Sequence, residues 1–193
     1  KSTMSLLLSG IALSSLCSAV ITMLLALHVE RWELGLKVMS WLMGSFEGRS
    51  WPHLLWSSPP LIAGLALALA LYRELDVLLL GNESAASIGV SLKRLRLVTL
   101  FCIALLVGTA TAIVGVIGFI GLVVPHISRR LVGAAHGRMI PLSLMLGALL
   151  MLWVDTLSRS VSHVVLPPGV ITSLLGAPFF LWLLYRHEKR PSP

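Results

Sequence analysis

The chain has 193 residues, of which 56% are hydrophobic and 12% are charged, and its mean hydropathy is +0.92. Because an ordinary soluble domain is roughly a quarter charged, this composition excludes a water-soluble globular protein. The net charge is +7, but the basic residues cluster beside apolar segments, which indicates membrane topology and excludes a nucleic-acid-binding surface.

Six apolar segments predict an all-α polytopic transmembrane bundle that forms a single membrane domain over residues 1–193, since a crossing takes roughly 20 residues. In the second segment, Pro59 and Pro60 are expected in the first helical turn, where proline is tolerated. The fourth segment is short and contains a proline, so its length alone fits either a crossing or a re-entrant segment. The segments are 5–28, 56–80, 97–115, 116–131, 142–157 and 170–185.

Residues 30–51 mix charged side chains with tryptophans, and their apolar residues fall at helical spacing, which predicts a short interfacial helix outside. Two apolar segments separate each basic cluster from the next. The positive-inside rule therefore places all three clusters in the cytoplasm and favours 116–131 as a true crossing. The clusters are Arg73 with Lys93, Arg94 and Arg96, then Arg129, Arg130 and Arg138, and finally Arg186, Lys189 and Arg190.

Three long motifs cover much of the chain. They are LGNESAASIGVSLKRLR at 80–96, GVIGFIGLVVPHISRRLVG at 115–133 with HGRMIP at 136–141, and LPPGVITSLLGAPFFLWLL at 166–184. Together these motifs resemble the permease subunit of FecCD-type ABC importers, which carry ferric siderophores, haem or cobalamin.

The resemblance implies the C-terminal six-helix portion of a type II ABC importer permease in the bacterial inner membrane, with the family's N-terminal helices missing. The chain opens without an initiator methionine, so we expect it to continue something longer. The implied partners are ABC ATPase subunits, a periplasmic substrate-binding protein and a second permease, in a homodimer or a heterodimer of paralogues. We expect no cofactor, and the implied cargo is a ferric siderophore, with haem and cobalamin as alternatives.

The polar stretch after the second segment is expected to form a short helix over residues 83–89, bounded by Gly81 and Gly89. By resemblance this is the coupling helix that docks on the ATPase; the alternative is a solvated loop. The predicted coupling residues are Glu83, Ser84, Ala85, Ala86, Ile88 and Gly89. The predicted cytoplasmic anchors are Arg94, Arg129, Arg130 and Arg138.

Asp155 and Arg159 stand four residues apart and therefore share a helical face near the outer end of the fifth segment. By resemblance, Arg159 receives an acidic residue of the substrate-binding protein. The alternative is a simple intrahelical salt bridge with Asp155.

Pro125, Gly176 and Pro178 are predicted helix breaks, at which backbone polar groups can face a water-filled pathway. Packing kinks are the equal alternative. His126 has no second His, Cys or carboxylate at ligand spacing, so we expect a structural role and no metal site. Cys17 and Cys102 lie far apart in apolar runs and are expected to be buried, inert thiols.

The chain has no G-x-x-x-x-G-K-[ST] motif and no nucleophile triad, so we do not expect it to be an enzyme. Its energy must come from a partner. An ion-coupled secondary carrier is the rival interpretation, and it would need ionisable residues in the middle of the membrane. Asp155 is the best candidate for such a residue. A purely structural scaffold is the third interpretation.

Overall fold

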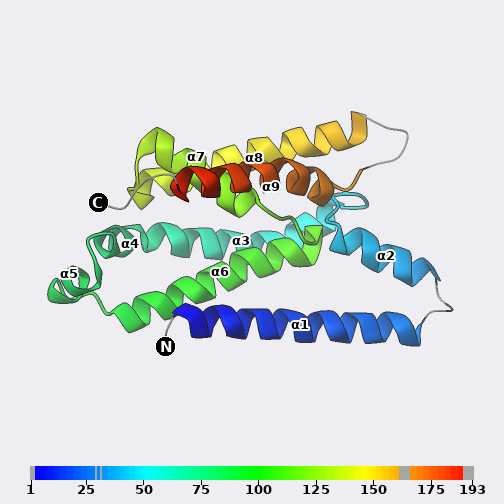
Figure 1. The fold of residues 1–193 in the computed structure, drawn as a ribbon, viewed down its shortest axis with the longest axis horizontal. Coiled ribbons are helices and arrows are strands. Elements are labelled where there is room, and N and C mark those ends of the chain that lie inside the picture. Colours follow the sequence, from blue (N-terminus) through cyan, green and yellow to red (C-terminus); the bar gives the residue numbers. More distant parts are fainter. Residues whose placement is uncertain (1–2, 29, 31, 161–165, 189–193) are drawn as a thin grey trace. The chain divides into compact units, whose positions relative to one another are not determined.

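The computed structural model describes residues 3–28, 30, 32–160 and 166–188, which form nine helices and no strand within those ranges (Figure 1). The predicted all-helical class is confirmed. The chain divides into two compact units, residues 1–42 and 43–193, which are described separately. The single domain expected over the whole chain stays a prediction.

The first unit contains α1 (Thr3–Leu27) and α2 (Trp32–Leu42). The helix α1 is apolar and long enough to cross a bilayer, as expected for the first segment. The helix α2 is the short helix that the spacing of apolar residues predicted. Cys17 is exposed on α1, so the expectation of two buried thiols is wrong for this residue.

Among the residues that the structure describes, four helices are long and apolar enough to span a membrane, namely α1, α3, α6 and α8. The last predicted segment falls in α9 (Pro168–Glu188), whose apolar part is 16 residues long, from Pro168 to Leu183. The fourth falls in α7 (Ile120–Val132), which has only 13 residues. Four of the six expected crossings therefore meet the length criterion within the described part of the chain.

The second predicted segment forms two helices, α3 (Trp51–Ala70) and α4 (Tyr72–Leu78), which meet at Leu71. Our prediction placed its start at Trp56, but the helix begins five residues earlier. The backbone N–H of Ser50 donates to Nδ1 of His53 at 3.3 Å, which caps this earlier start.

Pro59 and Pro60 consequently lie inside α3 and not in its first turn, which corrects the prediction. Pro59 has no N–H to donate to the carbonyl of Leu55. The hydroxyl of Ser58 donates to that carbonyl instead, at 3.1 Å, so the proline leaves no backbone acceptor empty here. Hydroxyl side chains of this kind let proline persist inside a membrane helix.

The helix α6 (Leu92–Val114) packs against α3 through a close approach at Gly64. A Cβ atom on Gly64 would lie 2.7 Å from the side chain of Leu106, so a larger residue would push the two helices apart. Cys102 is buried at the same contact and its thiol lies 3.1 Å from the carbonyl of Gly64. This cysteine matches the expected buried thiol.

Residues 115–119 leave the helical path between α6 and α7. Gly115 has φ +82°, and Phe119 has φ +64°, a left-handed conformation that is unusual for a residue with a Cβ atom. The 13 residues of α7 cover about 20 Å, and the five preceding residues add at most about 18 Å. The two pieces together therefore have the length of one crossing, although α7 alone does not.

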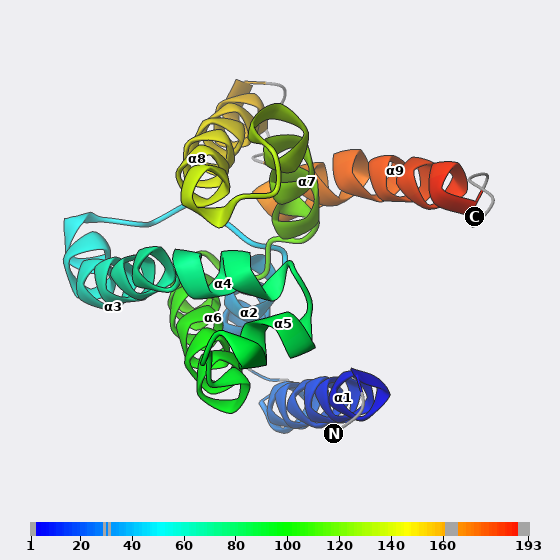
Figure 2. The same cartoon turned by 90° about the vertical axis from the view of Figure 1, so that its left-hand side faces the viewer.

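The helices α7, α8 (His136–Ser160) and α9 pack together in the second unit (Figure 2). Glycines allow the non-helical residues 115–119 to approach α9. A Cβ atom on Gly176 would lie 2.2 Å from Cβ of Phe119, and one on Gly169 would lie 2.9 Å from the carbonyl oxygen of Val116. The path of residues 115–119 therefore depends on two glycines of another helix.

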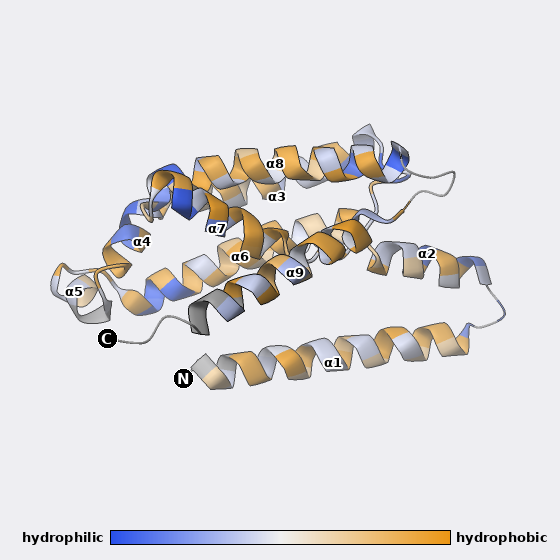
Figure 3. Ribbon diagram, turned by 45° about the horizontal axis from the view of Figure 1, so that its top comes forward, coloured by the Kyte–Doolittle hydropathy of each residue, from blue (hydrophilic) through white to orange (hydrophobic). Residues whose placement is uncertain are grey.

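Polar residues of the second unit gather around α4, the start of α6 and the junction of α7 with α8, which lie at the same end of the unit (Figures 1 and 3). Seven basic residues of the described ranges fall on these elements. They are Arg73, Lys93, Arg94, Arg96, Arg129, Arg130 and Arg138. Their position at one end agrees with the alternating topology that the positive-inside rule predicted.

We predict that changing Gly176 to alanine destabilises the protein by about 1–3 kcal/mol, because the new methyl group overlaps Phe119 and the packed residues must move apart. Thermal unfolding of the full-length permease in detergent measures this effect. Gly147 is a matched control within α8, since its added Cβ would meet nothing within 4 Å. A G176A protein as stable as G147A would contradict the proposed contact.

Candidate functional site

The short helix α5 (Asn82–Ser87) occupies the polar stretch that the sequence singled out. Gly81 precedes it with φ +103° and Gly89 follows it with φ +89°, so both glycines hold backbone conformations that other residues rarely adopt. The expected helix over 83–89 is therefore present, but it ends two residues earlier because the chain turns at Ile88 and Gly89. Its N-terminal side chains, including that of Glu83, lie outside the described part of the structure.

Ala85 has no exposed surface, so it faces the interior of the unit and not a partner. This corrects the expectation that Ala85 shares a contact surface with Ala86 and Ile88. The backbone of Ala85 is also held within this segment. Its N–H donates to the carbonyl of Gly81, and its carbonyl accepts a hydrogen bond from the N–H of Val90. Ala86 is exposed, and Ile88 is 65% exposed despite its apolar side chain. Ala86 and Ile88 are therefore two exposed apolar residues at the C-terminal end of α5, in a surface that also contains the exposed side chains of Ser84 and Ser87.

The predicted cytoplasmic anchors lie on elements at the same end of the second unit as α5 (Figure 1). Arg94 lies in the first turn of α6, while Arg129 and Arg130 lie in the last turn of α7. Arg138 lies in the first turn of α8. All four are exposed, as an anchoring role at an anionic membrane surface requires.

One carboxylate joins α4 to the first residue of α8. Oδ1 of Asp76 accepts a hydrogen bond from the backbone N–H of His136 at 2.6 Å. The same oxygen lies 2.7 Å from Nδ1 of His136, which donates to it. Beside this pair, Gly137 faces the ring of Tyr72, where an added Cβ would lie 3.0 Å from the ring. Tyr72 and Asp76 are four residues apart and so contact α8 from one face of α4.

The pKa of Asp76 lies below its ordinary value, chiefly because the backbone N–H of His136 stabilises the ionised carboxylate. Desolvation opposes this effect, while the side chain of His136 adds to it. The position at the start of α8 is also favourable for a negative charge, because the first N–H groups of a helix point outward. Asp76 therefore acts as a cap for α8 that is supplied by another helix.

Our sequence analysis missed this cap, because it assigned no role to Asp76. A signal was present in the residues that precede α8. Gly133, Ala134 and Ala135 have no side chain that can accept a hydrogen bond. Because the first N–H groups of a helix need partners, a helix that starts after such residues requires an acceptor from elsewhere.

At the opposite end of α8, Nε of Arg159 lies 3.0 Å from Oδ2 of Asp155. The predicted intrahelical salt bridge is therefore present. The side chain of Arg159 is nevertheless 55% exposed, so its remaining donors are available to another molecule. Nearby, the hydroxyl of Ser158 donates to the carbonyl of Leu166, which fixes the end of α8 to the start of α9.

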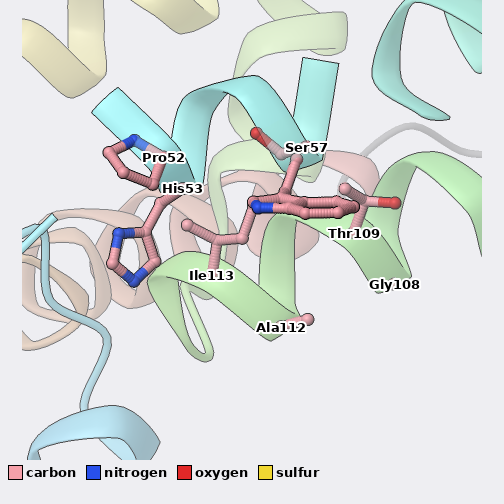
Figure 4. A pocket seen from close by; sticks show the side chains of 8 residues that line it. Pro52, His53, Ser57, Gly108, Thr109, Ala112 and Ile113 are labelled. Carbon is pink, nitrogen blue, oxygen red and sulfur yellow. The ribbon is translucent and has the colours of Figure 1, made fainter. Parts of the chain in front are cut away.

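A groove of about 490 Å³ lies between α3 and α6 (Figure 4). The hydroxyl of Ser57 in its lining is already used, because it donates to the carbonyl of Leu54 at 3.1 Å. Within the described ranges, no three His, Cys, Asp or Glu side chains gather in a way that could hold a metal ion. The lining consists of Pro52, His53, Trp56, Ser57, Gly108, Thr109, Ala112 and Ile113.

The predicted breaks at Pro125 and Pro178 are not seen, because α7 and α9 run through them without interruption. Gly176 acts instead as a close-packing position against Phe119. His126 contacts the ring of Phe179 edge to face, with 6.1 Å between the ring centres, which links α7 to α9. These contacts support the packing alternative for Gly176, while a pathway role for the three residues stays a prediction.

Comparisons with known proteins identify relatives over nearly the whole chain. A family model described as the FecCD transport family matches residues 1–186. The hemin transport system permease protein of Yersinia pestis is 41% identical over 189 residues, which cover 97% of this chain and 56% of the relative. The vitamin B12 import system permease protein of Vibrio cholerae is 42% identical over 190 residues, which cover 96% of this chain and 56% of the relative.

A solved structure, described as an inward-facing conformation of a metal-chelate type ABC transporter, matches with a TM-score of 0.88 and 38% identity. The match covers 96% of this chain and 60% of the solved chain. The chain thus spans little more than half the length of the relatives that it matches.

We predict that changing Asp76 to asparagine lowers the melting temperature at pH 7, and that this difference disappears in acid. Because the pKa of Asp76 is lower in the folded protein than its ordinary value of 3.8, the carboxylate stabilises the fold above that value. The contribution is lost as the pH falls through the folded pKa. Melting curves of wild type and D76N from pH 7 to about pH 3 measure the change.

Glu74→Gln is the matched control, since Glu74 is an exposed carboxylate on the same short helix. This variant is expected to melt near the wild-type temperature throughout. A wild-type advantage over D76N that grows on acidification would contradict the predicted direction of the shift.

Proposed function

Because the chain belongs to the FecCD transport family, we propose that it is the C-terminal part of the permease subunit of an ABC importer for metal chelates. The proposed cargo is a ferric siderophore, with haem and cobalamin as alternatives. The named substrates of the relatives support this class, since hemin and vitamin B12 are both large metal chelates. The multi-pass fold, with four apolar helices in the described residues, fits the proposed location in the bacterial inner membrane.

The observation that carries this proposal is the outward surface of α5. An isoleucine that is 65% exposed beside an exposed alanine, at the basic end of the unit, is an exposed apolar group of the kind that docks into a partner's groove. We assign this surface, with Glu83, Ser84 and Gly89, to contact with an ABC ATPase. The exposed arginines at this end of the unit would hold it at the anionic leaflet.

At the outer end, we assign Arg159 to the contact with a periplasmic substrate-binding protein. Asp155 holds one edge of the guanidinium at 3.0 Å and so fixes its direction, while the exposed part can pair with a carboxylate of the partner. The salt bridge and the docking role are therefore compatible. A second permease subunit, identical or paralogous, would complete the translocation path.

The rival function, an ion-coupled secondary carrier, receives less support from the structure. Such a carrier needs ionisable residues deep within its spans. Asp155 was the best candidate, but it lies five residues before the end of α8 and pairs with Arg159.

Uptake into proteoliposomes separates the two functions. Uptake by an importer of the proposed kind stops without ATP and continues when a protonophore is added.

We predict that changing Ala86 to glutamate in the full-length permease abolishes substrate-stimulated ATP hydrolysis by the reconstituted complex. A charged side chain at the centre of the apolar contact would lose its hydration when the ATPase docks. Ala86→Ser is the matched control, because a small hydroxyl side chain keeps the surface nearly unchanged. Hydrolysis and uptake that stay at the wild-type level in A86E would remove α5 from the ATPase contact.

We also predict that Arg159→Ala weakens binding of the substrate-binding protein about 10-fold or more, as expected for loss of one charge-assisted contact. Binding is measured by surface plasmon resonance on permease in nanodiscs. Asp155→Asn is expected to cost less, since it removes only the residue that orients Arg159. If both variants lose stability equally and bind normally, Arg159 serves only the intrahelical salt bridge.

A further inference from the structure

We propose that the contact between Asp76 and His136 makes α4 and α8 move as one body, so that displacement of α5 by the ATPase reaches the outer end of the permease through α8. This inference rests on the proposed function, because it assumes an ATPase at α5 and a binding protein at Arg159. It assigns Asp76 and His136 as positioning residues for coupling, and neither touches the cargo.

The first step is the connection between α5 and α4, which is a hydrogen-bonded turn. Backbone bonds continue from one helix to the next, since the N–H groups of Leu79, Leu80 and Gly81 donate to carbonyls three residues earlier. Ala85 is then fully buried within the unit. A force on the exposed surface of α5 is therefore expected to move α4 as well, because the backbone N–H groups of residues 79–81 are all bonded to carbonyls of α4.

The second step is the contact between α4 and α8, which joins residues that are 60 positions apart in the sequence. Asp76 holds both the backbone and the side chain of His136, at 2.6 and 2.7 Å. Both groups are partly shielded, with exposed side-chain fractions of 32% for Asp76 and 17% for His136. A charge-assisted pair that is partly buried in this way resists separation more than one on an open surface.

Shape reinforces the charge at this contact. Gly137 lets the ring of Tyr72 approach the start of α8, where a Cβ atom would come within 3.0 Å of the ring. The ring and the carboxylate thus hold two successive residues of α8 from one face of α4. Two contacts a helical turn apart restrain rotation as well as translation.

The third step is α8 itself, whose 25 residues extend about 37 Å as one helix that continues through Pro141 in its second turn. Its first residue is held by Asp76, and its last turn carries Arg159 and the bond from Ser158 to Leu166. A rigid helix with one held end transmits displacement to the other end. The same helix therefore connects the proposed ATPase contact with the proposed binding-protein contact, and the connection works in both directions.

The experiment uses the full-length permease in nanodiscs with its ATPase subunits and its binding protein, loaded with a ferric siderophore. Three quantities are measured: basal ATP hydrolysis, affinity for the binding protein, and stimulation of hydrolysis by that protein. For Asp76→Ala we expect the first two to stay within about twofold of wild type, while stimulation falls at least about fivefold. The exposed neighbour Glu74→Ala is the control and should keep all three.

Two further variants separate coupling from stability. Asp76→Glu keeps a carboxylate and is expected to restore most of the stimulation, whereas the double variant D76A/H136A should be no worse than D76A, because the two residues act as a unit. Stimulation that survives in D76A overturns the inference. A parallel fall of all three quantities with the melting temperature also overturns it, since that pattern marks a merely structural contact.

Failure of the proposed function would look different. In that case the wild-type complex itself would show no ATP-dependent uptake and no stimulation by the binding protein. A wild type that is fully coupled, together with a D76A variant that is equally coupled, removes only the role of Asp76 and leaves the importer assignment in place.

Discussion

Backbone hydrogen bonding is the constraint on which the second unit depends. Within the hydrocarbon region of a membrane, each N–H and carbonyl group must find its partner within the protein, because lipid offers none. The hydroxyl of Ser58 takes the carbonyl that Pro59 leaves empty, and Asp76 takes an N–H at the start of α8. Polar side chains are scarce here, and several of them are used where a helix is interrupted or begins.

The same constraint explains where glycine is used. Residues 115–119 leave the helical path, and their backbone is brought close to α9 by Gly169 and Gly176. Non-helical backbone at membrane depth persists where protein surrounds it or where it lines a water-filled space. The left-handed Phe119 packs on Gly176, so one unusual conformation is stabilised by the absence of a side chain on another helix.

Much of the fold follows from the sequence because long apolar segments form helices wherever they lie. The helices α1, α6 and α8 and the short α5 were expected near their observed positions. The start of α3 was not expected at its observed position. The prediction placed the two prolines in the first helical turn, whereas the helix begins beside a hydrogen bond between Ser50 and His53. The contact of Asp76 with His136 was also missed, because the residues before α8 indicate that an acceptor is needed but not which residue, 60 positions away, supplies it.

The burial of Ala85 has a consequence for the energetics of association. A six-residue helix has little stability by itself, and a segment that folds only on contact loses conformational entropy at that moment. Because α5 is already held against its own unit through Ala85 and the turns at Gly81 and Gly89, most of that cost is met during folding. Even a contact area as small as Ala86 and Ile88 can then give useful affinity, because the surface is preorganised.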